Sequence, residues 1–274
     1  NPERKLDPAE VTKLRGGVGA LLFLCYTRAD ILADVVVLPQ HVCSAKISHL
    51  RQCNSIIRRA HADADIGLIF LRLDPPYRLV AINDASHASS KTSYAVEGQM
   101  IMKMSDRMSN LKKGEFPGQW CNGYAHCLVH SAKRSKRISH STSHAESLAQ
   151  HGGLTHAELI SMRITEVSWP TPPTLQDLID ADSDAKYEVP IDTMTDCRDL
   201  FELETGVKGV PQDRSQRLIV MSLREKRLIN KLRHTIWCDT TDMLANSLTK
   251  HSTCDPLFYR YLKSGYINMQ KQML

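Results

Sequence analysis

Apolar residues recur at helical spacing throughout the first quarter of the chain. The segment Asp-Pro-Ala-Glu at positions 7–10 has the pattern of a helix start, with an N-cap, a proline at the first helical position and a capping-box glutamate. Two later runs, about 31–38 and 44–64, keep the same period of three to four residues. We therefore predict that this part of the chain, as far as about residue 64, forms a helical module.

Beyond this module the apolar period changes to two, which is typical of strands. Residues 67–71, 78–82 and 94–102 predict an antiparallel meander, and the aperiodic residues 103–119 are interpreted as a surface insertion. The rest of the chain mixes both periods. It predicts strands over 125–131, 189–195 and 235–238, and helices over 141–167, over 198–204 and from Thr241 onward.

Composition narrows the class of protein. The 274 residues are 42% hydrophobic and 24% charged, the balance of a folded globular chain, and no stretch of about 18 apolar residues predicts a membrane span. Eight scattered cysteines favour reduced thiols over a disulfide framework. The net charge of +5 is too small to prove a nucleic-acid partner. Because the chain begins with Asn1, we expect it to be a piece of a longer protein.

Carboxylates occur where the predicted elements begin or end. Asp84 follows an apolar strand, Glu146 lies in the first turns of a serine-capped helix, and Asp196 ends a strand. Asp242 or Asn246 lies in the predicted last helix. Carboxylates from separate elements could together hold two Mg²⁺ ions for phosphoryl transfer, since Mg²⁺ prefers hard oxygen ligands. With 30 acidic residues in the chain, a single one is more often a surface charge.

The segments around these carboxylates resemble, in order, the end of the Pol polyprotein of Copia-type LTR retrotransposons. Residues 14–31 are similar to the family's reverse-transcriptase tail, with Thr-Arg-Ala-Asp-Ile where the family has Thr-Arg-Pro-Asp-Ile. Residues 83–86, 139–146 and 195–200 resemble three catalytic segments of its RNase H region. Residues 239–250 resemble the closing Leu-Ala-Asp-x-x-Thr-Lys motif. The matches cover most of the chain.

The resemblance implies an α/β fold, with an RNase H-like mixed five-stranded sheet flanked by helices. It divides the chain into a small helical reverse-transcriptase tail like a thumb or connection (1–74), an RNase H-like domain (75–252) and a C-terminal extension (253–274). It also implies a metal-dependent endonuclease that cleaves the RNA strand of RNA–DNA hybrids during reverse transcription. Asp84, Glu146 and Asp196 would be ligands for Mg²⁺, for which Mn²⁺ can substitute.

The same resemblance implies partners. An RNA–DNA hybrid would be held through phosphate contacts by the basic residues of two segments, which are Lys133, Arg134, Lys136, Arg137, Arg214 and Arg217. The other partner would be the remainder of the Pol polyprotein, including the polymerase domain, because this chain lacks a Tyr-x-Asp-Asp motif. The expected location is the cytoplasm, in a virus-like particle, with the nucleus as an alternative. No membrane partner is expected.

The chain departs from the family pattern at its fourth acid, which aligns with Asn246. An amide offers a neutral oxygen without charge, so a second Mg²⁺ should bind more weakly. Asp242, four residues earlier, is a candidate substitute if both lie on one helix. The alternative function is therefore a catalytically degenerate RNase H-fold domain that only binds nucleic acid or scaffolds the polyprotein.

Other chemistry finds less support in the sequence. Cys121, Cys127 and His130 cluster on one hairpin, but their spacing matches no common zinc finger. His140 and His144 stand beside the serine-rich cap and are interpreted as surface residues. No Gly-x-Ser-x-Gly elbow indicates a hydrolase of another class.

Overall fold

The computed structural model describes residues 1–86, 95–106, 121–250, 255–270 and 272–273. Its helices are α1 (Pro8–Leu24), α2 (Leu32–Val35), α3 (Ile47–Ala62), α4 (Thr142–Ser168), α5 (Leu175–Ser183), α6 (Arg198–Thr205), α7 (Arg214–Leu228), α8 (Asn246–Thr249) and α9 (Pro256–Ser264). Short 3-10 helices are η1 (Ala29–Ile31), η2 (Leu38–Ser44) and η3 (Thr240–Asp242). The strands are β1 (Tyr77–Ser86), β2 (Val96–Ser105), β3 (Gly123–Arg134), β4 (Ile191–Thr195), β5 (His234–Cys238), β6 (Tyr266–Ile267) and β7 (Gln272–Met273).

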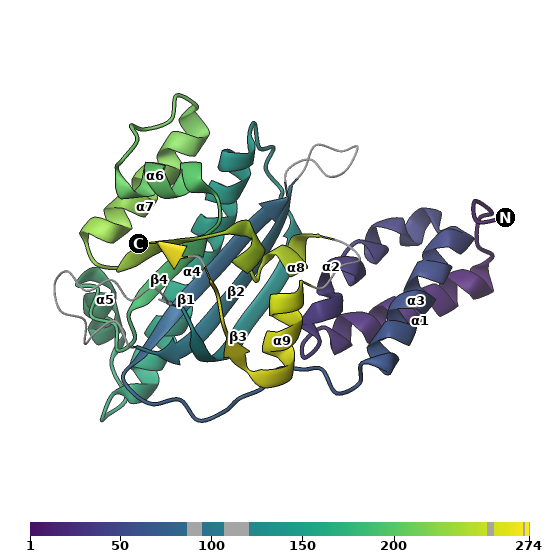
Figure 1. Cartoon of the computed structure of the whole chain (residues 1–274), viewed down its shortest axis with the longest axis horizontal. Coiled ribbons are helices and arrows are strands. Elements are labelled where there is room, and N and C mark those ends of the chain that lie inside the picture. Colours follow the sequence, from purple (N-terminus) through teal and green to yellow (C-terminus); the bar gives the residue numbers. More distant parts are fainter. Residues whose placement is uncertain (87–94, 107–120, 251–254, 271, 274) are drawn as a thin grey trace.

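One mixed sheet organises the molecule, in the order β6-β3-β2-β1-β4-β5-β7 (Figure 1). Strands β1, β2 and β3 form an antiparallel meander, whereas β4 runs parallel to β1, and β5 runs parallel to β4. The two-residue strands β6 and β7 pair at the edges. Five long strands flanked by helices confirm the predicted α/β fold class. They also confirm the strands expected over 78–82, 94–102, 125–131, 189–195 and 235–238.

Each face of the sheet is covered by helices, because alternate side chains of a strand point to opposite faces. On one face, Leu79 and Ala81 of β1 pack against α4 and α7 through Leu154, Ala157 and Leu223. On the other face, a larger apolar core joins Val80 and Ile82 to α8 and α9 and to the N-terminal helices. These N-terminal helices lie beside the sheet (Figure 1).

Helix α4 passes very close to the sheet at two glycines. A Cβ atom on Gly153 would lie 1.7 Å from Asn83 Oδ1, and one on Gly152 would lie 2.6 Å from Gln99 Nε2. The helix is nevertheless continuous over its 27 residues. Glycine is therefore required here by close packing between helix and sheet.

Three predicted elements differ from the structure. Residues 67–71 form no strand in the described chain; instead Leu68 packs against the larger core, and His126 is hydrogen-bonded to the backbone oxygen of Leu71. The run 31–38 is a series of short helical turns, and the helix expected from Thr241 is divided into η3, α8 and α9. In each case, the apolar pattern indicates which residues are buried but does not fix the type or the length of the element.

Two further expectations meet the structure only in part. The insertion expected over 103–119 begins later, because β2 continues to Ser105; residues 107–120 lie outside the described chain. The boundary proposed between residues 252 and 253 also lies outside it. Among the described helices, none is both long and apolar enough to cross a membrane.

Candidate metal centre

The pairing of β1 with β4 brings two of the predicted carboxylates to the same end of the sheet. Ile82 of β1 is paired with Met194 of β4 in parallel register. Asp84 and Asp196 each lie two residues beyond this pair, so both reach the carboxyl end of their strands. This is where side chains from parallel strands can act on a common ligand.

The third carboxylate comes from the start of α4. Ser141 caps this helix by accepting a hydrogen bond from the backbone N–H of His144, which fixes where the first turn begins. Glu146 follows at the start of the second turn and approaches Asp84 and Asp196. One carboxylate oxygen from each of the three residues lies within 4.8 Å of the others. The structure thus brings together the three residues that the sequence proposed as ligands.

These carboxylates are held largely out of water. Asp84 and Glu146 are each 4% exposed, and Asp196 is partly exposed. Burial raises the pKa of Glu146 well above its usual range, and the negative charges of Asp84 and Asp196 raise it further. Burial also raises the pKa of Asp84. A divalent cation would offset this repulsion, and the all-oxygen set of donors suits Mg²⁺ or Mn²⁺.

Helix α8 contacts this centre through Thr249. The hydroxyl of Thr249 donates a hydrogen bond to Asp84 Oδ2. Gly98, paired with Asp84 across β1 and β2, leaves room for this helix, because a Cβ atom there would lie 2.7 Å from Thr249 Cγ2. Neither Gly98 nor Thr249 is among the residues predicted for the site, although Thr249 belongs to the closing Thr-Lys pair of residues 239–250.

The fourth position is occupied by an amide whose polar atoms are both engaged. Asn246 is buried; its Nδ2 donates to the backbone oxygen of Thr240 (2.8 Å), and its Oδ1 accepts from Lys250 Nζ (2.6 Å). The positive charge of Lys250 lowers the pKa of both Asp84 and Glu146, against the larger effect of burial. The ammonium group of Lys250 thus acts on the carboxylates as a nearby positive charge.

Asp242 does not join the carboxylate group. It ends η3, and Met243 then adopts an extended backbone before α8 begins at Asn246, so residues 242 and 246 do not share a helix. Asp242 Oδ2 instead accepts a hydrogen bond from the backbone N–H of Gln270 (2.8 Å). The expectation that Asp242 lies one turn before Asn246 on the same helix is therefore wrong.

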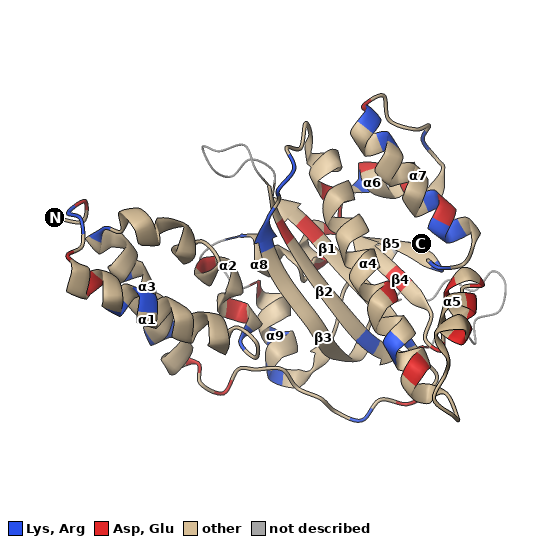
Figure 2. Ribbon diagram, turned by 180° about the vertical axis from the view of Figure 1, so that it is seen from behind, with Lys and Arg blue, Asp and Glu red and all other residues tan. Residues whose placement is uncertain are grey.

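The six predicted phosphate-binding residues lie in two places, near the end of β3 and at the start of α7 (Figure 2). Lys133, Arg134, Lys136, Arg137 and Arg214 are exposed. Lys133 forms an ion pair with the buried Glu97 at 3.4 Å, and Arg217 donates to the backbone oxygens of Pro211 and Gln212. Arg217 therefore has a structural role at the start of α7 in addition to any contact with phosphate.

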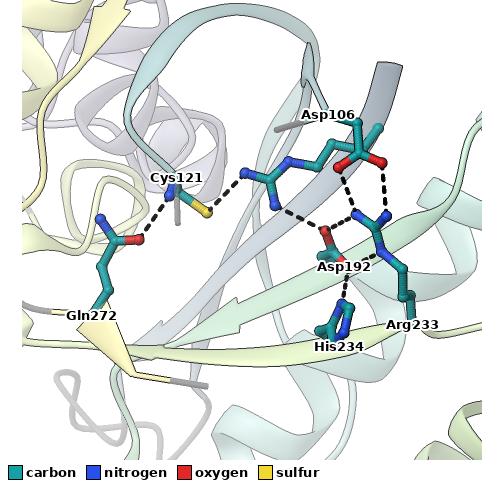
Figure 3. A network of polar contacts seen from close by, with 7 residues as sticks. Asp106, Cys121, Asp192, Arg233, His234 and Gln272 are labelled. Carbon is teal, nitrogen blue, oxygen red and sulfur yellow. Dashed lines mark hydrogen bonds and ion pairs between the residues drawn. The ribbon is translucent and has the colours of Figure 1, made fainter. Parts of the chain in front are cut away.

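A second set of charges is buried in the sheet, in the network of Figure 3. Arg78 of β1 donates to Asp192 of β4 at 2.9 Å, and both side chains are almost fully buried. Arg233 donates to both Asp192 and Asp106, and His234 contacts Asp192 at 3.1 Å. Sequence patterns give no sign of this network, because most of its members are far apart along the chain.

This network is separate from the metal centre. Asp192 of β4 lies four residues before Asp196 and pairs with Val80 of β1. It is buried within the strand and does not lie at the strand's carboxyl end. Burial opposes its ionisation, yet hydrogen bonds from His234 and Arg233, with the charge of Arg78, lower the pKa of Asp192. Ion pairs and hydrogen bonds to Asp192 thus link β1, β4 and β5.

The cysteine and histidine candidates do not form a second metal site. Within the described ranges, the acidic group is the one cluster with metal-ligand geometry. Cys127 Sγ lies 3.9 Å from His130 Nδ1, and the other ring nitrogen of His130 contacts the backbone oxygen of Cys25. His140 is exposed, but the prediction that His144 is a surface residue is wrong: it is 3% exposed and contacts Ser215 of α7.

Comparison with known proteins gives structural neighbours only. No family model matches the sequence, and no curated protein matches it. Among solved structures, the chain is similar to LC11-RNase H1, isolated from compost by a metagenomic approach, with 11% identity, a TM-score of 0.39 and coverage of 62% of this chain and 91% of that one. It is also similar to RNase H1 from the halophilic archaeon Halobacterium salinarum, with 15% identity, a TM-score of 0.32 and coverage of 58% and 81%.

Proposed function

We propose that this chain is the RNase H region of a Copia-type retrotransposon Pol polyprotein, and that it cleaves the RNA strand of RNA–DNA hybrids with divalent metal ions. The observation that carries the proposal is the convergence of Asp84, Glu146 and Asp196, whose oxygens lie within 4.8 Å of one another. The sequence resemblance around the same three residues supports the family. The polymerase domain and the rest of Pol would be partners, in a cytoplasmic virus-like particle or in the nucleus.

The three carboxylates would hold the metal, and Mg²⁺ or Mn²⁺ would stabilise the charge that develops on a phosphate during cleavage. Thr249 restrains the orientation of the Asp84 carboxylate by donating a hydrogen bond to Oδ2. The cap at Ser141 fixes Glu146, because it sets the start of α4. Both carboxylates must lose their protons before metal can bind, so acid should inhibit binding.

The hybrid would lie across the exposed basic residues near the centre. Lys136 and Arg137 are in the segment that leads from β3 into α4, the helix that carries Glu146. Contacts to phosphates would position the duplex without reading bases. Such binding should weaken as salt is raised, because counterions compete for the phosphates.

A degenerate, non-cleaving domain is the second candidate, and the environment of Asn246 favours it. The side-chain amide of Asn246 is hydrogen-bonded to Thr240 and Lys250, so it is not available as a metal ligand without rearrangement. A domain with this change could still bind hybrids or scaffold the polyprotein. Cleavage and metal binding must therefore be measured separately.

The test is cleavage of a labelled RNA–DNA hybrid with Mg²⁺ or Mn²⁺, beside calorimetric titration of Mn²⁺. We expect one tight Mn²⁺ site in the unaltered protein, lost in Asp84→Asn. We expect Asn246→Asp to add a second site and to raise cleavage. Glu188→Gln, an exposed acid elsewhere, is the matched control and should change neither.

The outcomes separate the two candidates. Cleavage that disappears in Asp84→Asn supports the nuclease. Metal binding without cleavage, followed by cleavage in Asn246→Asp, supports the degenerate domain. Absence of a Mn²⁺ site in every variant would contradict both the metal centre and the proposed enzyme.

A further inference from the structure

Another buried carboxyl group, that of Glu204 in α6, lies outside the group of three carboxylates. Glu204 is 3% exposed, and its Oε2 accepts hydrogen bonds from Gln150 Nε2 (2.7 Å) and Thr235 Oγ1 (2.9 Å). The same Gln150 amide also donates to Thr193 Oγ1 at 3.0 Å. These contacts join four elements, α6, α4, β4 and β5, at one point on the sheet.

Two oxygens in this cluster remain without partners. Glu204 Oε1 and Gln150 Oε1 are both buried, and neither has a hydrogen-bond partner in the described part of the chain. A buried acceptor without a partner costs free energy, and the cost is larger when the group is charged. Since an ionised carboxylate and an amide oxygen can only accept, the two oxygens cannot satisfy each other while Glu204 is ionised.

We propose that Glu204 carries a proton on Oε1 and donates it to Gln150 Oε1, so that acid and amide form a doubly hydrogen-bonded pair that positions the start of α4. One hydrogen would then satisfy both oxygens. Gln150 lies one helical turn after Glu146 on the same helix, so the pair would hold Glu146 in place. Glu204 is thus a positioning residue; only its link to Glu146 rests on the proposed function.

The surroundings favour the neutral acid. Burial raises the pKa of Glu204 to about 8, against the hydrogen bond from Thr235 and the charge of Arg227, which lower it. The groups that contact Glu204 from α4 and β5 are the uncharged Gln150 and Thr235, and Thr193 of β4, which accepts from Gln150, is also uncharged.

The charged groups on the remaining side come from α7. Arg224 donates to the backbone oxygens of Leu203 and Lys208. Arg227 Nη1 is buried without a hydrogen-bond partner among the described residues. Ionisation of Glu204 would therefore favour contact with Arg227 over the pair with Gln150, and would loosen α4.

The direction of the pH effect follows from the raised pKa. The stabilisation is fully present below the ordinary glutamate value of 4.5, declines as pH rises, and is lost above the folded value of about 8. Glu204→Gln is the matched variant, because its amide can donate to Gln150 and accept from Thr235 at any pH. Comparison with this variant also removes the contributions of Asp84 and Glu146.

The experiment is urea denaturation of the metal-free protein and of Glu204→Gln between about pH 5 and 9, with the carboxyl ¹³C resonance of Glu204 followed by NMR. Relative to Glu204→Gln, we expect the folding equilibrium constant of the unaltered protein to fall by up to about tenfold per pH unit until pH 8. The resonance should titrate near pH 8. Parallel pH profiles, or titration in the ordinary glutamate range, would overturn the proposal even if a variant folds poorly.

Mn²⁺ titration then tests the link to Glu146. Gln150→Leu should weaken Mn²⁺ binding by about tenfold, and Glu204→Gln should preserve it. Unchanged affinity in Gln150→Leu would contradict the positioning role. Absence of Mn²⁺ binding in the unaltered protein would instead count against the proposed function. The pH profiles of unfolding would still show whether Glu204 and Gln150 form the acid–amide pair.

Discussion

Glu146 combines burial with two neighbouring negative charges, and in the absence of metal this arrangement costs folding free energy. Its raised pKa is the direct sign of that cost. Function and stability therefore oppose each other at this residue, as is common where charges are assembled for a ligand.

We expect Glu146→Gln to raise the unfolding free energy of the metal-free protein by about 0.5–2 kcal/mol at neutral pH, because it removes a buried charge from the cluster. The same change should abolish stabilisation by Mn²⁺. Urea denaturation with and without metal measures both effects. Glu188→Gln, at an exposed position, is the control; a metal-free Glu146→Gln protein less stable than the parent would contradict the argument.

The buried charge of Asp192, unlike that of Glu146, stabilises the fold, because Arg78 and Arg233 form ion pairs with it. Asp192→Asn should lower the unfolding free energy by about 3–5 kcal/mol, because it leaves Arg78 buried with a weakened partner. The change Asp199→Asn, in a half-exposed ion pair with Lys208, should have little effect. Equal effects of the two changes in denaturant titration would show that the buried network contributes no more than a surface pair.

The lowered pKa of Asp192 also determines how its contribution to stability changes with pH. Its stabilising contribution is present above the usual range of an aspartate and is lost as pH falls through the lowered folded value. Acid unfolding of Asp192→Asn should therefore depend less on pH than that of the unaltered protein.

At the scale of elements, the contact between α4 and β1 determines where Glu146 meets Asp84. Gly153→Ala would place a Cβ atom 1.7 Å from Asn83 Oδ1. We expect it to cost about 1–3 kcal/mol of stability, as overpacking does, and to weaken Mn²⁺ binding by displacing α4.

The matched control is Gly16→Ala in α1, where a Cβ atom would meet nothing within 4 Å. Alanine there should stabilise the protein by about 0.5–1 kcal/mol, because it reduces the freedom of the unfolded chain in a helical position. Thermal unfolding of both variants gives the comparison. Tolerance of alanine at Gly153 would mean that α4 does not pack as closely as described.

At the scale of the whole molecule, metal binding should be coupled to folding. A ligand at 100 times its Kd stabilises the native state by about 2.7 kcal/mol. Because the pKa values of Asp84 and Glu146 are raised, the metal-free protein should lose stability as pH rises through them. Mn²⁺ should reverse this trend, since it binds the deprotonated carboxylates.

Melting temperatures with Mn²⁺ and with a chelator, measured from about pH 5 to 8, test this coupling. The stabilisation by Mn²⁺ should increase with pH and should be absent in Asp84→Asn. A metal effect that is independent of pH, or that persists in Asp84→Asn, would place the binding site elsewhere.

Local patterns predicted most of the fold because the apolar period reports directly which face of an element is buried. The strands expected over 78–82 and 94–102 and the Ser141 cap of α4 are confirmed. The run 67–71 misled the prediction, because burial of Leu68 against a core leaves the same apolar pattern as strand pairing. Period alone does not distinguish these two causes.

The sequence by itself determined the chemistry available: three carboxylates at element ends and an amide at position 246. Only the tertiary structure decided which of them meet. The parallel register of β1 and β4 brings Asp84 to Asp196, while the extended backbone at Met243 separates Asp242 from α8. The networks around Asp192 and Glu204 join residues far apart along the chain, and local patterns contain no information about such contacts, because packing alone brings their partners together.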